Sequence, residues 1–489
     1  MTPAKTILLY NHATGTGHHE SWTALFAALL LERGYRVICI TPNTAALAVV
    51  LETQGICTND NLHLLEMPTI VPPPPTFRQQ LKTQWGCLVR GLCRTGDGSV
   101  GTTGGAGVAI EWRPTLRDRW RLNAHRYAKN ESEVQVTDDL PVVVRLKRHF
   151  LHLFVPPVWY ALEALRLVVH RLRRPTIHGG ERCPSNLVTA ANLALNQARW
   201  KPDYILSMYA DIWLTNPRFW RKSISIPLPW GGIRFVPFPA DSAAREGCFR
   251  DGNFRGLCFL DEGAIENYKR RDSRRTYQFL PDVANISLPP SQPVIARELS
   301  LLANGRKIVL LCGSIESRKN VQAFCKMALM PSANHYFFAI VGQLHPATFS
   351  AAESKLLKLF SESSNKNTLL RNHYFEDEKD MNAVIQVADI IFAVYKNFGI
   401  SSNMLGKAAG FKKPILVSEN YLMGKRVFQY GIGISTPEDD ALKILENLEL
   451  LNKSGVPEEN FYKFSLDFSK NLLGDSLHYF IQKSLNGVR

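Results

Sequence analysis

The residues of this chain most able to do chemistry lie in a short glycine-rich segment close to its start. Residues 7–10 are apolar and residues 22–30 follow a helical pattern. The segment between them carries Thr14, Gly15, Thr16, Gly17, His18, His19 and Glu20. A glycine turn between a strand and a helix lets backbone N–H groups face an anion. A histidine there can also exchange a proton near neutral pH. The segment therefore predicts an anion site with a proton-transfer group beside it.

Two details argue against the most familiar use of such a segment, the binding of a nicotinamide or flavin dinucleotide. Glu20 stands where the third glycine of the Gly-x-Gly-x-x-Gly pattern is expected, and a carboxylate there opposes a pyrophosphate. The second strand, residues 36–41, leads into Thr41-Pro42-Asn43, which offers no acid for a ribose hydroxyl. We therefore expect neither a dehydrogenase nor a resident cofactor.

The elements around this segment predict a parallel, doubly wound sheet. Residues 5–66 alternate strand and helix patterns in the order βαβαβ, and the alternation resumes at residues 187–238. Further strands are expected near 233–236 and 257–260. Strands that alternate with helices in this way build parallel sheets with helices on both faces.

The stretch between these two regions, about residues 70–185, is interpreted as a large insertion in the first domain. It opens with Pro72–Pro75, and residues 95–107 are rich in Gly, Ser and Thr, which is typical of a flexible segment. Residues 143–174 place aromatic and leucine side chains between basic ends, a pattern suited to an anionic membrane interface. A core helix with snorkelling basic ends is the alternative for this segment.

A second α/β alternation follows a proline-rich linker at residues 288–293. Strands are expected at 308–311, 336–341, 390–394 and 414–417. Helices are expected at about 320–330, 346–360, 380–387, 401–411, 423–430 and 438–453, followed by a helical stretch at about 459–485 without a strand partner. We expect domains at 1–288 and 289–465, with a C-terminal helix at 466–489 that crosses back to the first domain.

Length and charge set limits on the partners. A chain of 489 residues is long for one core, so two domains are expected. With 58 Lys+Arg against 43 Asp+Glu, the net charge of +15 favours anionic partners such as nucleic acid, acidic lipid or phosphorylated metabolites. The 9 cysteines form no CxxC pair, which predicts reduced thiols, a cytoplasmic location and no zinc site. No apolar run reaches the roughly 18 residues that span a bilayer.

The second domain carries residues suited to hold a phosphorylated ligand without a metal. Gly313 follows a strand, and Arg318 and Lys319 enter the next helix. Two cations at a helix N-terminus oppose the helix dipole unless an anion binds there, although a solvated terminus is the alternative. Serines and an asparagine that suit both capping and hydroxyl or phosphate binding open the later helix, namely Ser401, Ser402 and Asn403. Lys407, one turn further on, either reaches the same anion or lies on a solvated face.

These residues resemble the second domain of GT-B glycosyltransferases, especially the family 4-like group. Residues 312–320 are similar to the strand, loop and helix start in which a glycine and a lysine hold the donor diphosphate. Residues 388–395 and 401–418 resemble the donor loop, the donor-site helix and the strand behind it. The segment Gly15–His18 is similar to the first-domain loop that faces the acceptor and the transferred sugar. The resemblance implies two Rossmann-like domains facing a cleft, and a nucleotide sugar as substrate.

Within this resemblance His18 is the candidate general base for the acceptor hydroxyl, because a helix N-terminus keeps a histidine neutral. A histidine that only caps the helix is the alternative. Glu20 either orients a histidine or is an ordinary first-turn acid.

The sequence departs from the pattern of the family 4-like group at two places. Ser314 occupies the place of a usual arginine, and no acid stands where the family has a Glu-x7-Glu pair, whose second position is Lys407.

We therefore expect a metal-independent glycosyltransferase that moves a sugar from a nucleotide sugar to a glycan or lipid-linked acceptor. The segment 143–174 would hold it at the cytoplasmic face of an anionic membrane. A non-catalytic GT-B-like binding or scaffold protein is the alternative, because the arginine and the acidic pair are missing. The net positive charge is the one feature that suggests a nucleic-acid partner. Because no nucleic-acid recognition motif accompanies it, we expect no such partner.

Overall fold

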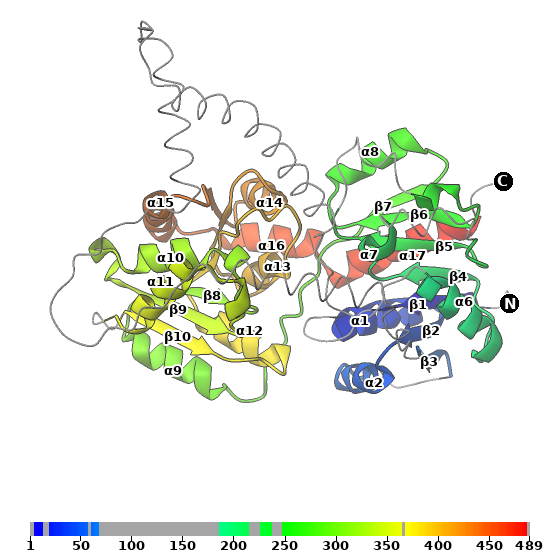
Figure 1. The fold of residues 1–489 in the computed structure, drawn as a ribbon, viewed down its shortest axis with the longest axis horizontal. Helices are drawn as coiled ribbons and strands as arrows, with labels where there is room; N and C mark the ends of the chain where they lie inside the picture. The colour runs from blue at the N-terminus through cyan, green and yellow to red at the C-terminus, as the bar shows by residue number, and fades with distance from the viewer. Residues whose placement is uncertain are drawn as a thin grey trace, which may run out of the picture. The chain divides into compact units, whose positions relative to one another are not determined.

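A computed structural model describes residues 4–12, 19–56, 60–67, 185–214, 225–236, 247–363 and 367–486. These residues build two parallel β-sheets, each flanked by helices (Figure 1). The first sheet has seven strands in the order β3-β2-β1-β4-β5-β6-β7, and the second has six in the order β10-β9-β8-β11-β12-β13. The predicted α/β class with two doubly wound sheets is confirmed.

The first sheet is built from residues on both sides of the predicted insertion. Its strands are β1 (Thr6–Tyr10), β2 (Arg36–Thr41), β3 (Leu62–Glu66), β4 (Tyr204–Ser207), β5 (Trp230–Arg234), β6 (Phe254–Phe259) and β7 (Thr276–Phe279). The helices between them are α1 (His19–Glu32), α2 (Thr44–Thr53), α6 (Ser185–Gln197), α7 (Asp211–Leu214) and α8 (Gly263–Arg271). The basic and aromatic segment 143–174 lies outside the described residues.

The second sheet follows in one continuous stretch of chain. Its strands are β8 (Lys307–Cys312), β9 (Tyr336–Gly342), β10 (Thr368–Asn372), β11 (Ile390–Ala393), β12 (Ile415–Ser418) and β13 (Gly433–Thr436). Its helices are α9 (Val294–Ala303), α10 (Val321–Ala328), α11 (Ala351–Ser361), α12 (Glu378–Val387), α13 (Asn403–Gly410), α14 (Leu422–Tyr430) and α15 (Ala441–Ser454). Two more helices close the described chain, α16 (Glu458–Asp467) and α17 (Lys470–Asn486).

The central strands are buried on both faces, which explains their continuous apolar sequences. All residues of β1 and of β9 are buried, as parallel sheets covered by helices require. Apolar clusters pack on each face of the first sheet, and one large cluster surrounds the second. These rigid strands fix the positions of the loops that leave their carboxyl ends.

Each sheet has a point where the order of its strands reverses. In the second sheet β8 lies between β9 and β11, because the chain first winds outward to β10 and then returns on the other side of β8. In the first sheet β1 lies between β2 and β4. Ligands of open α/β sheets bind outside the carboxyl ends of the strands at this switch point. The loops after β8 and β11 are therefore the geometrically favoured binding segments of the second sheet.

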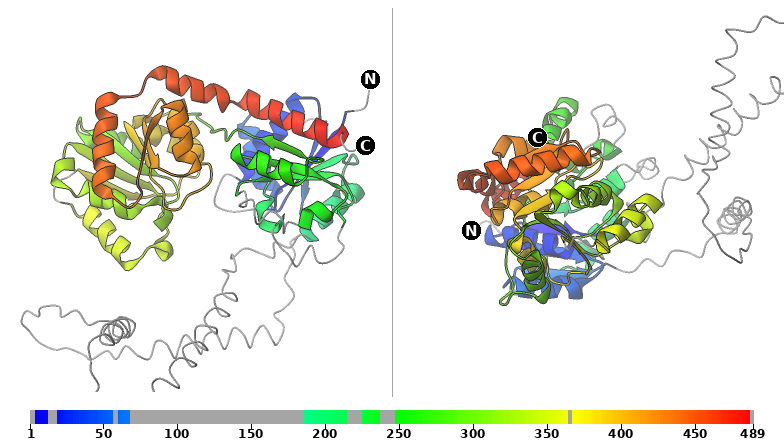
Figure 2. Two further views of the ribbon diagram at one scale, coloured as in Figure 1. Left: turned by 90° about the horizontal axis from the view of Figure 1, so that it is seen from above. Right: turned by 90° about the vertical axis from the view of Figure 1, so that its left-hand side faces the viewer.

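The final helical stretch, predicted as one helix at about 459–485, is divided in two by Phe468 and Ser469. Helix α17 then packs against α1, β6 and β7 (Figure 2). Its buried side chains join the core cluster on one face of the first sheet, and they include Leu473, Leu477, Phe480 and Ile481. The C-terminal helix thus completes the core of the first sheet.

Strand β5 begins at Trp230, upstream of the predicted strand at 233–236. The glycines Gly231 and Gly232 hid this strand from sequence analysis, and close packing explains them. A Cβ on Gly231 would lie 2.2 Å from the hydroxyl of Tyr204, and one on Gly232 would lie 2.6 Å from Cβ of Ala210. No helix among the described residues is both long and apolar enough to cross a bilayer.

Candidate functional site

The loop after β8 turns sharply before the next helix, as the sequence predicted. Gly313 has φ of +95°, in the left-handed region that favours glycine. A short 3₁₀ turn, Ser317–Lys319, follows, and Asn320 at φ +58° leads into α10. The Asn320 side chain accepts a hydrogen bond from the backbone N–H of Ala323 at 3.4 Å and so caps α10. The chain therefore turns sharply between β8 and α10.

Lys319 is buried beneath this loop, with 7% of its surface exposed. Its Nζ donates to the carbonyl of Cys312 at 2.9 Å and to the hydroxyl of Tyr395 at 3.1 Å. A Cβ built on Gly313 would lie 3.5 Å from the same Nζ. The predicted alternative of a solvated helix terminus is therefore wrong for this residue.

The ammonium group of Lys319 lacks a counter-ion. An ammonium has three donors, and its two acceptors here are uncharged groups. No carboxylate pairs with Lys319 anywhere in the part of the chain that the structure describes. Burying an unpaired charge is costly, so such a group is a strong candidate for binding an anion.

Arg318 lies on the outer side of the same turn, with 43% of its side chain exposed. Its Nε donates to Oε2 of Glu316 at 3.1 Å, and its guanidinium lies 5.2 Å from the ring centroid of Phe398. Exposed ion pairs of this kind contribute little, so Arg318 can turn toward a ligand at small cost. Ser314, which replaces the usual arginine, lies 2.9 Å from Nε2 of His345. Sequence analysis missed His345 because it comes from the loop after β9.

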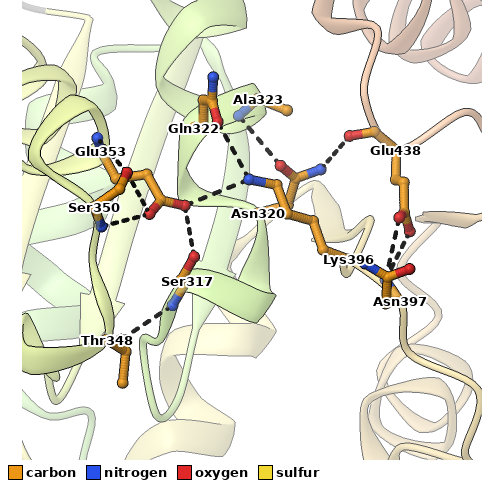
Figure 3. Close-up of polar contacts among 10 residues, drawn as sticks. All are labelled: Ser317, Asn320, Gln322, Ala323, Thr348, Ser350, Glu353, Lys396, Asn397 and Glu438. Atoms are coloured by element: carbon orange, nitrogen blue, oxygen red, sulfur yellow. Dashed lines mark hydrogen bonds and ion pairs between the residues drawn. The ribbon is translucent and has the colours of Figure 1, made fainter. Parts of the chain in front are cut away.

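The loop after β11, residues 394–402, is tied to the loop after β8 (Figure 3). The backbone N–H of Lys396 donates to the carbonyl of Arg318 at 2.8 Å. Its Nζ lies 3.4 Å from Oε1 of Glu353. The backbone N–H of Asn397 lies 3.1 and 3.0 Å from the two carboxylate oxygens of Glu438. The two loops at the switch point therefore form one hydrogen-bonded unit.

Glu353 anchors this unit from α11 and is 3% exposed. It accepts hydrogen bonds from the backbone N–H of Ser350 at 2.9 Å and from Oγ of Ser317 at 2.7 Å. Burial raises the pKa of Glu353, but these hydrogen bonds and the charge of Lys396 outweigh it, so its pKa is lowered. Sequence analysis missed Glu353, although the capping box Ser350-x-x-Glu353 was the signal that marked it.

The N-terminus of α13 presents the three predicted polar residues. Ser402 is the N-cap and accepts from the backbone N–H of Met404 at 3.3 Å. Ser401 Oγ donates to Oδ2 of Asp282 at 2.7 Å, so this hydroxyl is already engaged. Asn403 is the first residue of the helix and is half-buried. Capping accounts for Ser402, which leaves Asn403 and the helix N–H groups as candidate ligand contacts.

Lys407 does not lie on a solvated face, because it is 0% exposed. Its Nζ lies 2.7 Å from Oε1 of Glu378, donates to the carbonyl of Asn285 at 2.9 Å, and donates to Oδ1 of Asn382. Burial lowers the pKa of Lys407, and the charge of Glu378 partly offsets this. All three ammonium donors are occupied inside the protein, so we leave Lys407 out of the proposed donor set.

On the first sheet the structure describes only part of the predicted acceptor loop. Gly15, Thr16, Gly17 and His18 lie outside the described residues, so the assignment of His18 as base stays a prediction. His19 begins α1, and its ring lies 4.8 Å from the ring of Tyr209, which follows β4. Burial raises the pKa of Glu20. His19, Glu20 and Tyr209 follow the carboxyl ends of β1 and β4, the neighbouring strands at the switch point of the first sheet.

No protein-family model matches this chain, and no curated protein matches it. Solved structures resemble it in fold. An E. coli trehalose-6-phosphate structure bound with UDP-2-fluoro glucose has a TM-score of 0.55 at 10% identity, over 99% of this chain and 100% of that chain. The structure of Anabaena HepE in complex with UDP and glucose has a TM-score of 0.54 at 9% identity, over 98% of this chain and 100% of that chain. A glycosyltransferase from Rickettsia africae has a TM-score of 0.53 at 11% identity, over 99% of each chain.

At this identity the likeness concerns the fold. The fold with two parallel sheets flanked by helices is shared with these glycosyltransferase structures, and the predicted resemblance to the GT-B class is confirmed at the level of the fold.

Lys407→Met should destabilise the protein by about 3–5 kcal/mol, because it breaks a buried ion pair with Glu378 and removes the hydrogen bonds that the ammonium donates to Asn285 and Asn382. Urea denaturation followed by circular dichroism measures this loss. The double variant Lys407→Met/Glu378→Gln should recover part of it. Lys412→Met, which breaks an exposed pair with Glu458, is the matched control and should cost less than about 1 kcal/mol. Equal losses of stability in Lys407→Met and Lys412→Met would contradict the assignment of Lys407 to a buried ion pair.

The lowered pKa of Glu353 predicts an acid-dependent contribution to stability. A carboxyl whose folded pKa is depressed stabilises the fold fully above its ordinary pKa of about 4.3, and this stability is lost as pH falls through the folded pKa. The unfolding free energy of wild type should therefore fall more steeply below about pH 4 than that of Glu353→Gln. Urea titrations of both proteins across acidic pH measure this, and parallel curves would exclude the predicted shift.

Proposed function

We propose that this protein is a glycosyltransferase that moves a sugar from a nucleotide sugar to an acceptor hydroxyl without a resident metal ion. One observation carries the proposal: the buried ammonium of Lys319 has no counter-ion among the described residues and lies at the switch point of the second sheet. Lys407, which is also buried in the same domain, is neutralised by Glu378. The diphosphate of a donor would supply the charge that Lys319 lacks.

The chemistry of transfer requires such a group. When the bond between the sugar C1 and the diphosphate oxygen breaks, negative charge develops on the leaving diphosphate. A preorganised cation in a site of low dielectric stabilises that charge. Arg318 offers a second, more exposed cation on the same turn. The N–H groups at the start of α13 and the amide of Asn403 suit phosphate or sugar hydroxyls.

Two solved relatives in fold guide the choice of donor. The E. coli structure holds UDP-2-fluoro glucose, and the Anabaena protein holds UDP and glucose. Their ligands support a nucleotide sugar as the donor class, and they make UDP the first probe to use. We propose the same class of donor for this chain on the basis of Lys319.

On the acceptor side the proposal rests on the sequence. His18 would remove the proton from the acceptor hydroxyl, with His19 and Glu20 next to it in the chain. The basic and aromatic segment 143–174 suits an acceptor that is lipid-linked or held at an anionic membrane surface. A non-catalytic binding protein is the second candidate, because Ser314 and Lys407 stand where the related enzymes carry an arginine and an acid.

Lys319→Met should weaken the binding of UDP by about 10-fold or more, since it removes a charge-assisted hydrogen bond to a phosphate. Isothermal titration calorimetry with UDP, GDP and ADP measures the affinities. Lys412→Met, an exposed lysine paired with Glu458, is the matched control and should bind as wild type does. Unchanged binding in Lys319→Met would remove the basis of the proposal.

His18→Ala should separate donor binding from transfer. The variant should retain the affinity of wild type for the nucleoside diphosphate. It should lose about 10²–10⁴-fold in the hydrolysis or transfer of a labelled nucleotide sugar, the usual contribution of general acid–base catalysis. If wild type binds the donor but transfers its sugar to none of the acceptors in a broad panel, that result would favour the non-catalytic candidate.

A further inference from the structure

Arg426, on α14 of the second domain, is buried and reaches residues that are remote in the chain. Only 2% of it is exposed. Its Nη1 donates to Oγ of Ser401 at 2.7 Å. Its Nη2 donates to the carbonyl of Leu260, and to Oε1 and Oε2 of Glu262 at 3.3 and 3.1 Å. Leu260 and Glu262 follow β6 of the first sheet, so one guanidinium joins the loop before α13 to the first domain.

Two aromatic rings hold the guanidinium in place. Its Cζ lies 4.7 Å from the ring centroid of Phe468 and 5.8 Å from that of Phe279. Cation–π contacts of this kind are strongest where the cation is desolvated. The planar fork of an arginine also presents its donors in a fixed geometry, which the ammonium of a lysine does not. The two rings and the acceptors of Nη1 and Nη2 therefore restrict the guanidinium, whose buried Nε has no hydrogen-bond partner among the described residues.

Ser401 extends this arrangement to the segment that connects the two domains. A serine hydroxyl has one proton, which Ser401 gives to Oδ2 of Asp282 at 2.7 Å, so its oxygen accepts from Arg426. Asp282 is 7% exposed and lies between β7 and α9. The chain of hydrogen bonds thus runs from Glu262 through Arg426 and Ser401 to Asp282.

Helix α13 itself rests on the same connecting segment. A Cβ on Gly406 would lie 2.8 Å from Cβ of Ala284, and one on Gly410 would lie 2.6 Å from Cγ2 of Ile286. Lys407, between these glycines, donates to the carbonyl of Asn285 at 2.9 Å. The small residues of α13 therefore allow the connecting segment to lie directly against the helix whose N-terminus carries the proposed donor contacts.

We propose that Arg426 is a positioning residue that couples donor binding at the start of α13 to the segment after β6 of the first domain. The inference rests on the proposed function, because it takes the N-terminus of α13 as part of the donor site. Donor contacts with Asn403 and the adjoining N–H groups fix Ser401. Ser401 fixes one arm of the guanidinium, and the other arm then holds Leu260 and Glu262 in a single arrangement.

Hydrogen–deuterium exchange of the full chain, with and without saturating UDP, tests the coupling. In wild type UDP should slow exchange both in peptides that begin α13 and in peptides spanning residues 258–264. Ser401→Ala breaks the relay, the chain of hydrogen bonds that joins the start of α13 through Arg426 to Glu262. UDP should therefore still protect the start of α13 but lose its effect at residues 258–264. Ser401→Thr keeps the hydroxyl and should restore that effect. Ser402→Ala removes only the cap and is the control, so the remote protection should persist.

Affinities and kinetics separate positioning from simple destabilisation. Arg426→Lys and Ser401→Ala should each weaken UDP binding by about 5-fold or more, and the double variant should be no weaker than the worse single variant. In donor turnover both variants should raise KM more than they lower kcat.

Additive losses, or remote protection that survives in Ser401→Ala, would overturn the coupling. UDP binding by wild type without protection at 258–264 would also overturn it while leaving the proposed function intact. Failure of wild type to bind UDP, GDP or ADP would overturn the proposed function and the donor role of the relay together.

Discussion

The candidate site depends on the buried ammonium of Lys319, which no carboxylate among the described residues neutralises. Lys319 lies beneath the loop after β8, where the carbonyl of Cys312 and the hydroxyl of Tyr395 hold its ammonium. These acceptors belong to β8 and to the loop after β11, and the two strands are neighbours at the switch point. Neutral acceptors orient the ammonium but leave its charge, so the surrounding loops present a preorganised positive potential to an incoming anion.

The other buried cations of the second domain have a different role. Lys407 is matched by Glu378, and Arg426 by Glu262 and by the oxygen acceptors around it. Removing a partner from such a group leaves an uncompensated buried charge, so these residues organise the structure. Asp282, through Ser401, brings the connecting segment into the same polar network. The domain therefore holds the charge of Lys319, which we propose binds a ligand, and the paired charges of Lys407 and Arg426, which position the surrounding structure.

Sequence analysis predicted the central strands well because they are continuous apolar runs, buried on both faces. It missed β7, β10 and β13, which are edge strands with partly exposed residues and no such run. Local sequence also marked Gly313 and Lys319, since a glycine turn and a helix start are adjacent in the chain. It missed the partners of these residues, such as Tyr395, because only the winding of the sheet brings them together. Lys407 misled the analysis, since periodicity alone does not show whether a lysine on a short helix is solvated or paired.

The position of a bound nucleotide tests the central claim most directly. A crystal structure of the full chain soaked with UDP should place the diphosphate within hydrogen-bonding distance of Lys319 Nζ and next to the N-terminus of α13. It should leave the pair of Lys407 and Glu378 unchanged. A diphosphate bound elsewhere, with the ammonium of Lys319 still facing only Cys312 and Tyr395, would contradict the account.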